Sequence, residues 1–288
     1  MNTKHMERKF ITKQELVQQL EILAKKTKEE WLSELEERKL KELEFHDRDR
    51  NQELIKNYDK DTFEKLHGNK KFYKIVQISS NYVENWIKQF SREKIFLDYA
   101  CGNGAYAIKA AKAGAELAIG IDISETSIKN ARKFAQKEGV SDDTYFVMGD
   151  CENTGLPDSS IDIGICSGML HHLDLSFAFC ELRRILKRGG VILAIEALDY
   201  NPLIKLYRKL TPQMRTEWEA AHILSYKDIN FANKFFDVKK IKHWHLFSIA
   251  GTYFPFALPF FNVVDRFVLR IPILKMLSWM FTFELHKR

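Results

Sequence analysis

Between residues 94 and 198 the chain alternates short apolar runs with longer amphipathic segments. The runs predict strands, and the segments between them predict helices that end near Ala113 or span 124–138 and 176–186. Ser124 is placed to cap the second of these helices, and Gly189–Gly190 predicts a turn. Strands that alternate with helices form βαβ units, so the pattern predicts an α/β fold with a doubly wound, mostly parallel sheet. The predicted strands are 95–99, 117–123, 145–148, 161–166 and 191–197.

The flanks follow other patterns. Leu16, Leu20 and Leu23 recur at helical spacing and predict one or two exposed amphipathic helices from about Lys13 to Glu44. After residue 198 the alternation stops, and a late strand is predicted at 235–246. We therefore expect a helical N-terminal extension or lid at 1–93, a main domain at 94–246 with a helical insertion at 199–234, and a helical, aromatic and basic C-terminal segment at 247–288.

The charge of the chain is unevenly distributed. Its 45 Lys and Arg against 39 Asp and Glu give a formal net charge of +6. Residues 1–94 carry +3 and residues 199–288 carry +7, whereas residues 95–198 carry −4. Proteins that bind nucleic acid usually present a basic surface, whereas the middle of this chain is acidic. We therefore expect no nucleic-acid partner.

The cysteines and the first residues indicate a cellular location. Cys101, Cys151, Cys166 and Cys180 stand singly, without a CxxC pair or a short His–Cys spacing. This spacing predicts no disulfide framework and no metal site, and it suits a reducing cytoplasm. The first ten residues carry no apolar run after their charges, which predicts no signal peptide.

A glycine-rich turn follows the first strand, in FLDYACGNGAYAIKAA at 96–111. Gly102, Gly104 and Ala107 fit the G-x-G-x-x-G/A fingerprint of nucleotide binding, and Asp122 ends the next strand where an acid can bind a ribose. An NAD-dependent oxidoreductase is one interpretation. Asp98 disfavours it, because a carboxylate there repels a pyrophosphate and attracts a ligand that carries an ammonium and a sulfonium.

At these residues the chain resembles the class I S-adenosylmethionine-dependent methyltransferases, and within them the type-11 group of small-molecule enzymes. The resemblance covers about residues 94–198; Ala100 replaces the first glycine of the family's first motif. It implies that Asp122 accepts the ribose hydroxyls and that Asp150 accepts the adenine amino group beside the Cys151 amide. The cofactor-binding residues that it implies are Asp98, Ala100, Gly102, Gly104, Asp122, Ile123, Asp150, Cys151 and Ser167.

Methyl transfer to a hydroxyl also needs a base. His171 and His172 follow the fourth strand and Glu196 ends the fifth, at the sheet edge where α/β enzymes bind ligands. Either histidine can be the base or can merely pack or hydrogen-bond, and Glu196 is a candidate for contact with the acceptor. The segments 45–47 and 72–73 are candidates for a lid.

The chemical class of the methyl acceptor is indicated mainly by two sequence motifs that the chain lacks. CSGML follows the fourth strand in place of the NPPY-like tetrapeptide of nucleic-acid amino-methyltransferases, and no paired-Glu loop of the protein arginine type is present. We expect a small-molecule or lipid-linked acceptor. A non-catalytic module that binds S-adenosylmethionine is a further alternative.

The C-terminal segment leaves three interpretations open. Residues 246–264 carry no charge, but Gly251, Pro255 and Pro259 interrupt them, so a membrane-spanning helix is not expected. Residues 265–288 mix aromatic and basic side chains. This mixture suits peripheral contact of residues 247–288 with a membrane, packing onto the core, or a homodimer interface.

Overall fold

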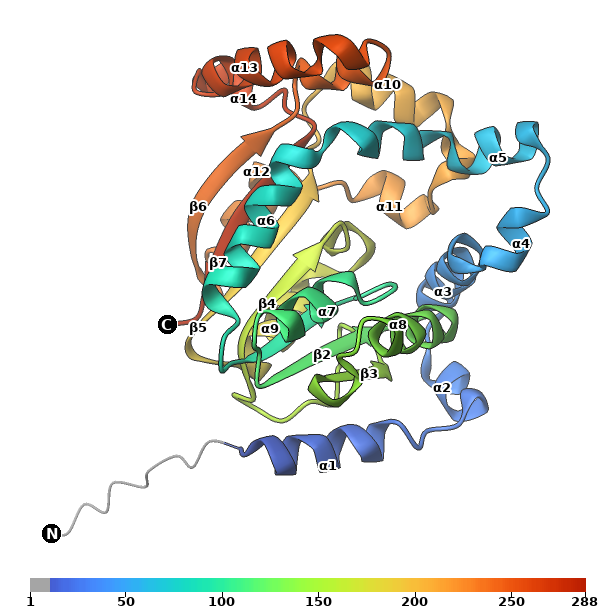
Figure 1. Cartoon of the computed structure of the whole chain (residues 1–288), viewed down its shortest axis with the longest axis vertical. Coiled ribbons are helices and arrows are strands. Elements are labelled where there is room, and N and C mark those ends of the chain that lie inside the picture. Colours follow the sequence, from blue (N-terminus) through green and yellow to red (C-terminus); the bar gives the residue numbers. More distant parts are fainter. Residues whose placement is uncertain (1–10) are drawn as a thin grey trace, which may run out of the picture.

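The protein is built on one seven-stranded sheet. The computed structural model describes residues 11–288, and its strands follow the order β3-β2-β1-β4-β5-β7-β6 (Figure 1). β7 runs antiparallel to both its neighbours, and the pairs among β1 to β5 are parallel. This confirms the predicted doubly wound, mostly parallel fold. The strands are β1 (Ile95–Tyr99), β2 (Leu117–Asp122), β3 (Thr144–Met148), β4 (Ile161–Ser167), β5 (Leu186–Ala197), β6 (Asp237–Trp244) and β7 (Met280–His286).

The two faces of the sheet belong to two apolar layers. Successive residues of a strand point to opposite faces, so Leu97 and Ile119 join one layer while Phe96 and Ala118 join the other. Side chains of α6, α7 and α8 cover the second layer, and those of α1, α9 and α12 cover the first. Ser124 accepts a hydrogen bond from the Ser127 amide and caps α8. The central helices are α7 (Ala105–Lys112), α8 (Glu125–Lys137) and α9 (Leu175–Ile185).

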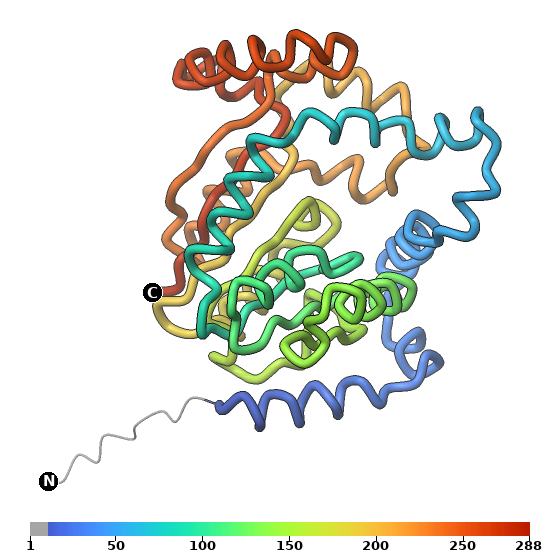
Figure 2. Tube along the Cα trace, in the orientation of Figure 1, coloured from blue at the N-terminus to red at the C-terminus, as the bar shows by residue number. Residues whose placement is uncertain are grey.

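The N-terminal extension wraps around the core: the blue to cyan trace in Figure 2 passes below it, turns upward on the right and returns to the left. Three helices occupy the region where one or two are predicted, because Thr12 and Thr27 each begin a helix with a reciprocal capping box. The third of them packs against α8, and the last helix of the extension packs against α7. The helices are α1 (Lys13–Leu23), α2 (Lys28–Glu34), α3 (Glu37–Arg50), α4 (Gln52–Lys56), α5 (Lys60–His67), the 3-10 helix η1 (Gly68–Ile75) and α6 (Gln77–Phe90).

The segment between β5 and β6 is mostly helical, as predicted. It holds α10 (Pro202–Leu210), α11 (Glu217–Ala221) and α12 (Tyr226–Ala232), with the short 3-10 helix η4 (Pro212–Met214) between the first two. Beyond β6 the chain forms two short 3-10 helices, η5 (Ser248–Thr252) and η6 (Pro255–Ala257), and then α13 (Leu258–Val268) and α14 (Pro272–Lys275). None of the described helices is both long and apolar enough to span a membrane.

The final strand differs from the prediction. The sequence pattern places residues 247–288 in a separate helical and aromatic segment, yet β7 lies inside the sheet between β5 and β6. Phe281, Phe283 and Leu285 are fully buried, so part of the aromatic content of the tail is core. Gly189–Gly190 also differs: the predicted turn lies within β5, where Gly189 has a positive φ of 78° and the register to β4 shifts.

Candidate functional site

Two cavities adjoin at the carboxyl ends of the central strands. The smaller has a volume of about 90 Å³ and the larger about 960 Å³. In open α/β sheets this edge is where ligands bind. Five residues line both cavities, so the two spaces share a wall: His46, Arg50, Ser167, Gly168 and His172.

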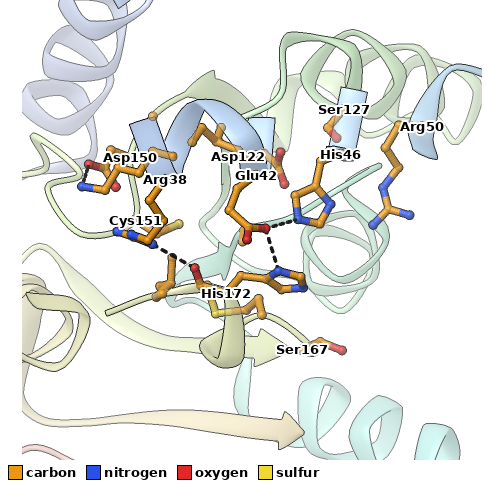
Figure 3. Close-up of a pocket in the computed structure, with 17 residues that line it drawn as sticks. Arg38, Glu42, His46, Arg50, Asp122, Ser127, Asp150, Cys151, Ser167 and His172 are labelled. Atoms are coloured by element: carbon orange, nitrogen blue, oxygen red, sulfur yellow. Dashed lines mark hydrogen bonds and ion pairs between the residues drawn. The ribbon is translucent and has the colours of Figure 1, made fainter. Parts of the chain in front are cut away.

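Six of the nine predicted cofactor residues line the smaller cavity, which Figure 3 shows in close-up. The other three, Asp98, Gly102 and Gly104, do not line it. The six are Ala100, Asp122, Ile123, Asp150, Cys151 and Ser167.

Asp98 lies beneath the glycine turn. Its Oδ2 accepts hydrogen bonds from the backbone amides of Tyr106 (3.2 Å) and Ala107 (3.0 Å), at the first turn of α7. Burial raises the pKa of Asp98 to about 7, although these two hydrogen bonds oppose the shift. This buried carboxylate has no cationic partner among the described residues. A cation bound nearby would therefore stabilise its charged form.

The turn itself needs residues without bulky side chains. Gly104 has a φ of 75°, and a Cβ there would lie 2.5 Å from the Phe146 ring. Ala100, which stands where the resembled family has glycine, also has a positive φ of 55°. A left-handed conformation is unfavourable for alanine. The turn thus keeps the glycine-type backbone even where the sequence departs from the motif.

Asp122 connects the turn to the start of α8. Its Oδ2 accepts from the Gly102 amide at 2.8 Å, and its Oδ1 accepts from the Ser124 amide at 2.9 Å. The carboxylate is buried, yet it lines the smaller cavity. Each carboxylate oxygen has a second lone pair, so Asp122 can still accept two hydroxyl donors.

One face of α3 closes this cavity. Arg38, Glu42, His46 and Arg50 follow one another at intervals of four residues and all line it. Figure 3 shows this row of side chains along the cavity. Only His46 of this row was predicted, within the lid candidate 45–47, because a polar helical face looks the same whether it meets water or a polar site. The i, i+4 spacing is the signal that could have found it.

Charged contacts hold α3 in place. Arg38 Nη2 donates to both carboxylate oxygens of Glu152, at 2.6 and 2.7 Å. Lys39 Nζ lies 2.8 Å from Asp150 Oδ2 and 2.9 Å from Glu152 Oε2. Burial opposes the Lys39 charge, but its hydrogen bonds to these acids outweigh burial and raise its pKa. Asp150, the predicted adenine acceptor, is thus already bonded to the helix that covers it.

Glu42 joins α3 to the loop after β4. Its Oε2 lies 2.9 Å from His172 Nδ1 and 3.6 Å from His46 Nε2, and its Oε1 accepts from the Thr216 hydroxyl at 2.5 Å. These two histidines and the carboxylate place ligand-type atoms within 4.8 Å of one another. The hydrogen bond between Glu42 and His172 and the edge contact of the His46 and His172 rings account for the arrangement, and the hydrogen bond fixes His172 against the helix.

His171 forms a pair with Glu196. His171 Nδ1 lies 2.6 Å from Glu196 Oε2, while Glu196 Oε1 accepts from the amides of Met169 (2.9 Å) and Leu170 (2.8 Å). Burial lowers the pKa of His171, but the charge and hydrogen bond of Glu196 overcome this and raise it above the ordinary value. Glu196 is fully buried and lines neither cavity, so the expected acceptor contact is corrected to a contact with His171.

His171 lines the larger cavity. Its Nδ1 is engaged by Glu196, and its Nε2 lies 4.0 Å from Glu219, another lining residue. Much of the remaining wall is aromatic or aliphatic, with Phe72 in edge contact with Tyr207, Tyr253 and Trp279. Arg208 and Arg215 add positive charge. The cavity suits a large, mainly apolar molecule that carries a polar group.

Comparison with known proteins identifies the central region. Residues 97–194 match the family model described as a methyltransferase domain. Demethylmenaquinone methyltransferase from Bacteroides fragilis is 35% identical over 127 residues, which are 43% of this chain and 51% of the relative. A ribosomal protein L11 methyltransferase from Photobacterium profundum is 31% identical over 46% of this chain and 45% of its own length. The chain thus spans about half the length of these relatives.

Solved structures share the fold. Magnesium protoporphyrin IX methyltransferase from Synechocystis superimposes with a TM-score of 0.59 and 16% identity, over 88% of this chain and all of that one (100%). Geranyl diphosphate C-methyltransferase from Streptomyces coelicolor gives 0.53 and 14% identity, over 73% of this chain and 79% of that one. The family-model match, the strand order and these likenesses agree with the resemblance read from residues 94–198: residues 97–194 form a methyltransferase domain, and the chain around it has the fold of the class I, S-adenosylmethionine-dependent enzymes.

Proposed function

We propose that this protein transfers a methyl group from S-adenosylmethionine to a large, mainly apolar acceptor, either a free small molecule or one linked to a lipid. One observation carries the proposal. A small cavity beside the glycine turn, lined by Asp122 and Asp150, adjoins a much larger cavity with aromatic and aliphatic walls, and His171, which Glu196 holds, lines the second.

The residues present fit this cofactor. The buried Asp98 has no cation beside it, and Asp122 and Asp150 supply carboxylates around the smaller cavity. Such a set favours a ligand with positive charge and several hydroxyl and amino donors over a dinucleotide pyrophosphate. In this assignment Asp122 binds the ribose, Asp150 the adenine amino group, and Ala100, Ile123 and Cys151 surround the rings.

Ser167, Gly168 and His172 line both cavities and would stand beside the reacting groups. When bound, S-adenosylmethionine would supply a methyl group on a sulfonium, and S-adenosylhomocysteine would remain after its transfer. His171 Nε2 would accept the proton that the acceptor hydroxyl gives up as it is methylated. Glu196 holds the imidazole in the tautomer that leaves this nitrogen free and stabilises the cation that forms. The aromatic wall excludes water and orients the acceptor.

The single most informative test uses methyl-labelled S-adenosylmethionine with aqueous and organic cell extracts, followed by mass spectrometry. We expect one labelled product, in the apolar fraction, together with S-adenosylhomocysteine. Calorimetry with S-adenosylmethionine and with NAD tests the cofactor separately. Binding of NAD alone would overturn the proposal, whereas tight binding of S-adenosylmethionine with no labelled product would favour a non-catalytic module.

The position of α3 predicts how the cofactor enters. A cavity of about 90 Å³ is small for a nucleoside that carries an amino acid, so we expect α3 to move outward when the cofactor binds. We expect Arg38→Met, which removes the ion pair to Glu152, to raise both the association and dissociation rates of S-adenosylmethionine about fivefold. Stopped-flow fluorescence measures both rates. Lys41→Met on the exposed side of α3 is the matched control, and unchanged rates in Arg38→Met would show that α3 does not limit entry.

The raised pKa of Asp98 predicts a pH dependence of binding. A cationic ligand binds best to the carboxylate form, so the affinity for S-adenosylmethionine should fall as the pH drops below about 7, with a proton released on binding. Calorimetry in buffers of different ionisation enthalpy measures that proton. In Asp98→Asn the amide oxygen can still accept from α7, so the variant should fold but bind weakly at every pH. A wild-type affinity that is flat from pH 5.5 to 8 would argue against this role.

A further inference from the structure

The most exposed large apolar side chains of the described chain gather at one end of the molecule. Phe256 is 86% exposed, Ile273 76% and Leu203 75%. They belong to η6, α14 and α10, which with α13 lie together at the upper end of the long axis in Figure 1. We call residues 202–210 and 253–276 the apolar end surface.

The two longer helices of this surface each expose an apolar row. On α10 the row is Leu203, Leu206 and Leu210, and on α13 it is Phe260, Val263 and Phe267. The spacing of three and four residues places each row on one side of its helix. Monomeric soluble proteins rarely expose contiguous apolar faces of this kind to water, so we expect this surface to bind a partner.

The charges around the surface have one sign. Its basic residues include Lys209, Arg266 and Arg270, which are exposed and form no ion pair with any carboxylate of the described chain. Its single acidic residue, Asp265, is buried and accepts hydrogen bonds from the amides of residues 246–248. An exposed face that is apolar and cationic is complementary to an anionic lipid surface.

The larger cavity opens at the same place. Leu203 and Tyr253 are more than half exposed and also line that cavity, so they stand at its mouth. Trp279 and His171 line its interior. The cavity that opens at this surface is therefore the one that His171 lines.

We propose that the apolar end surface docks on an anionic lipid bilayer and that the acceptor enters the larger cavity from that bilayer. The docking stands on the surface alone, while the entry of an acceptor rests on the proposed function. A second copy of the chain fits this surface less well. A twofold contact would bring Arg266 and Arg270 of both copies together without acidic partners and would cover the cavity mouth.

Vesicle sedimentation tests the docking without cofactor or acceptor. We expect the full chain to bind vesicles of phosphatidylcholine with 30% phosphatidylglycerol, and to bind pure phosphatidylcholine at least tenfold more weakly. The double variant Phe256→Ser, Phe260→Ser and the double variant Arg266→Gln, Arg270→Gln should each lower the partition coefficient about tenfold or more. Truncation is not a suitable test, because it would also remove β7.

The controls separate docking from misfolding and from self-association. Phe177 is 60% exposed on α9, outside this surface, so Phe177→Ser should bind vesicles like the wild type. Thermal unfolding confirms that all variants fold. Light scattering that shows a dimer, dispersed by Phe256→Ser, with no vesicle binding would overturn the proposal in favour of a second copy. Vesicle binding by a chain that fails to bind S-adenosylmethionine would leave the docking intact and refute the methyltransferase proposal instead.

Discussion

Replacing His171 with asparagine should lower the rate of methyl transfer about 10²- to 10⁴-fold, the range usual for loss of a general base. Its Nδ1 is engaged by Glu196 and its Nε2 side is open to the larger cavity, so the imidazole is placed to take the proton of a bound hydroxyl. The side chain lines the larger cavity and not the smaller one. The affinity for S-adenosylmethionine should therefore stay within about twofold. Labelled methyl transfer measures the rate and calorimetry the affinity.

The His171–Glu196 pair also predicts how kcat/KM depends on pH. The base must be neutral to act, so kcat/KM should rise with pH through a midpoint above the ordinary histidine pKa of 6.5. Glu196→Gln removes the charge that raises this pKa, so the midpoint should move to lower pH. A merely structural role for Glu196 would change the rate without moving the midpoint. Nuclear magnetic resonance titration of the His171 ring gives the same shift without an acceptor.

The raised pKa of His171 also makes the stability of the fold depend on pH. The folded pKa of His171 lies above its unfolded value, so the pair stabilises the fold fully below pH 6.5 and less as the pH rises through the folded pKa. His222 is exposed, stacks on Trp218 and hydrogen-bonds to its carbonyl, and it supplies the control variant His222→Asn. An unchanged transfer rate in His171→Asn, with the product identified, would remove the histidine from the mechanism.

The sequence predicted the centre of the fold well because its information is local there. The strands β1 to β4 and the second half of β5 are short runs rich in apolar residues, and Ser124 and the glycine turn mark the boundaries between strand and helix. The strand β7 was not predicted because polar and apolar residues are mixed in its sequence. Thr282 and Glu284 are buried in this strand beside Phe281 and Phe283. Glu284 accepts from Trp86 Nε1 at 2.9 Å and pairs with Lys240. These partners lie far away in the sequence, so no local pattern predicts that a carboxylate can be buried there.

The site was predicted unevenly for a related reason. The residues around the cofactor cavity belong to motifs with fixed spacing, and six of the nine line that cavity. Arg38, Glu42 and Arg50 were missed because a polar helix face carries no sign of which side meets a ligand. Leu203 and Tyr253 were missed as parts of the larger cavity because only the fold brings α10 and the region after η5 to one opening.

Asp122→Ala should weaken binding of S-adenosylmethionine by about 1–3 kcal/mol, or about 5- to 150-fold, through loss of charge-assisted hydrogen bonds to the ribose. The carboxylate lines the smaller cavity, and both its oxygens are held in place by backbone amides. Calorimetry on the folded variant measures the loss. The change also leaves the Gly102 and Ser124 amides without an acceptor, so thermal stability should fall and must be recorded separately.

A matched carboxylate separates these two effects. Asp162 accepts from the Ile95 amide at 2.9 Å, at the opposite end of β1 from the glycine turn, and lines neither cavity. Asp162→Ala should therefore lower stability but leave cofactor affinity unchanged. If Asp122→Ala lost no more affinity than Asp162→Ala, the ribose would have to bind elsewhere. A specific loss in Asp122→Ala would instead tie the smaller cavity to the nucleoside, because only this carboxylate joins the glycine turn, the start of α8 and the cavity wall.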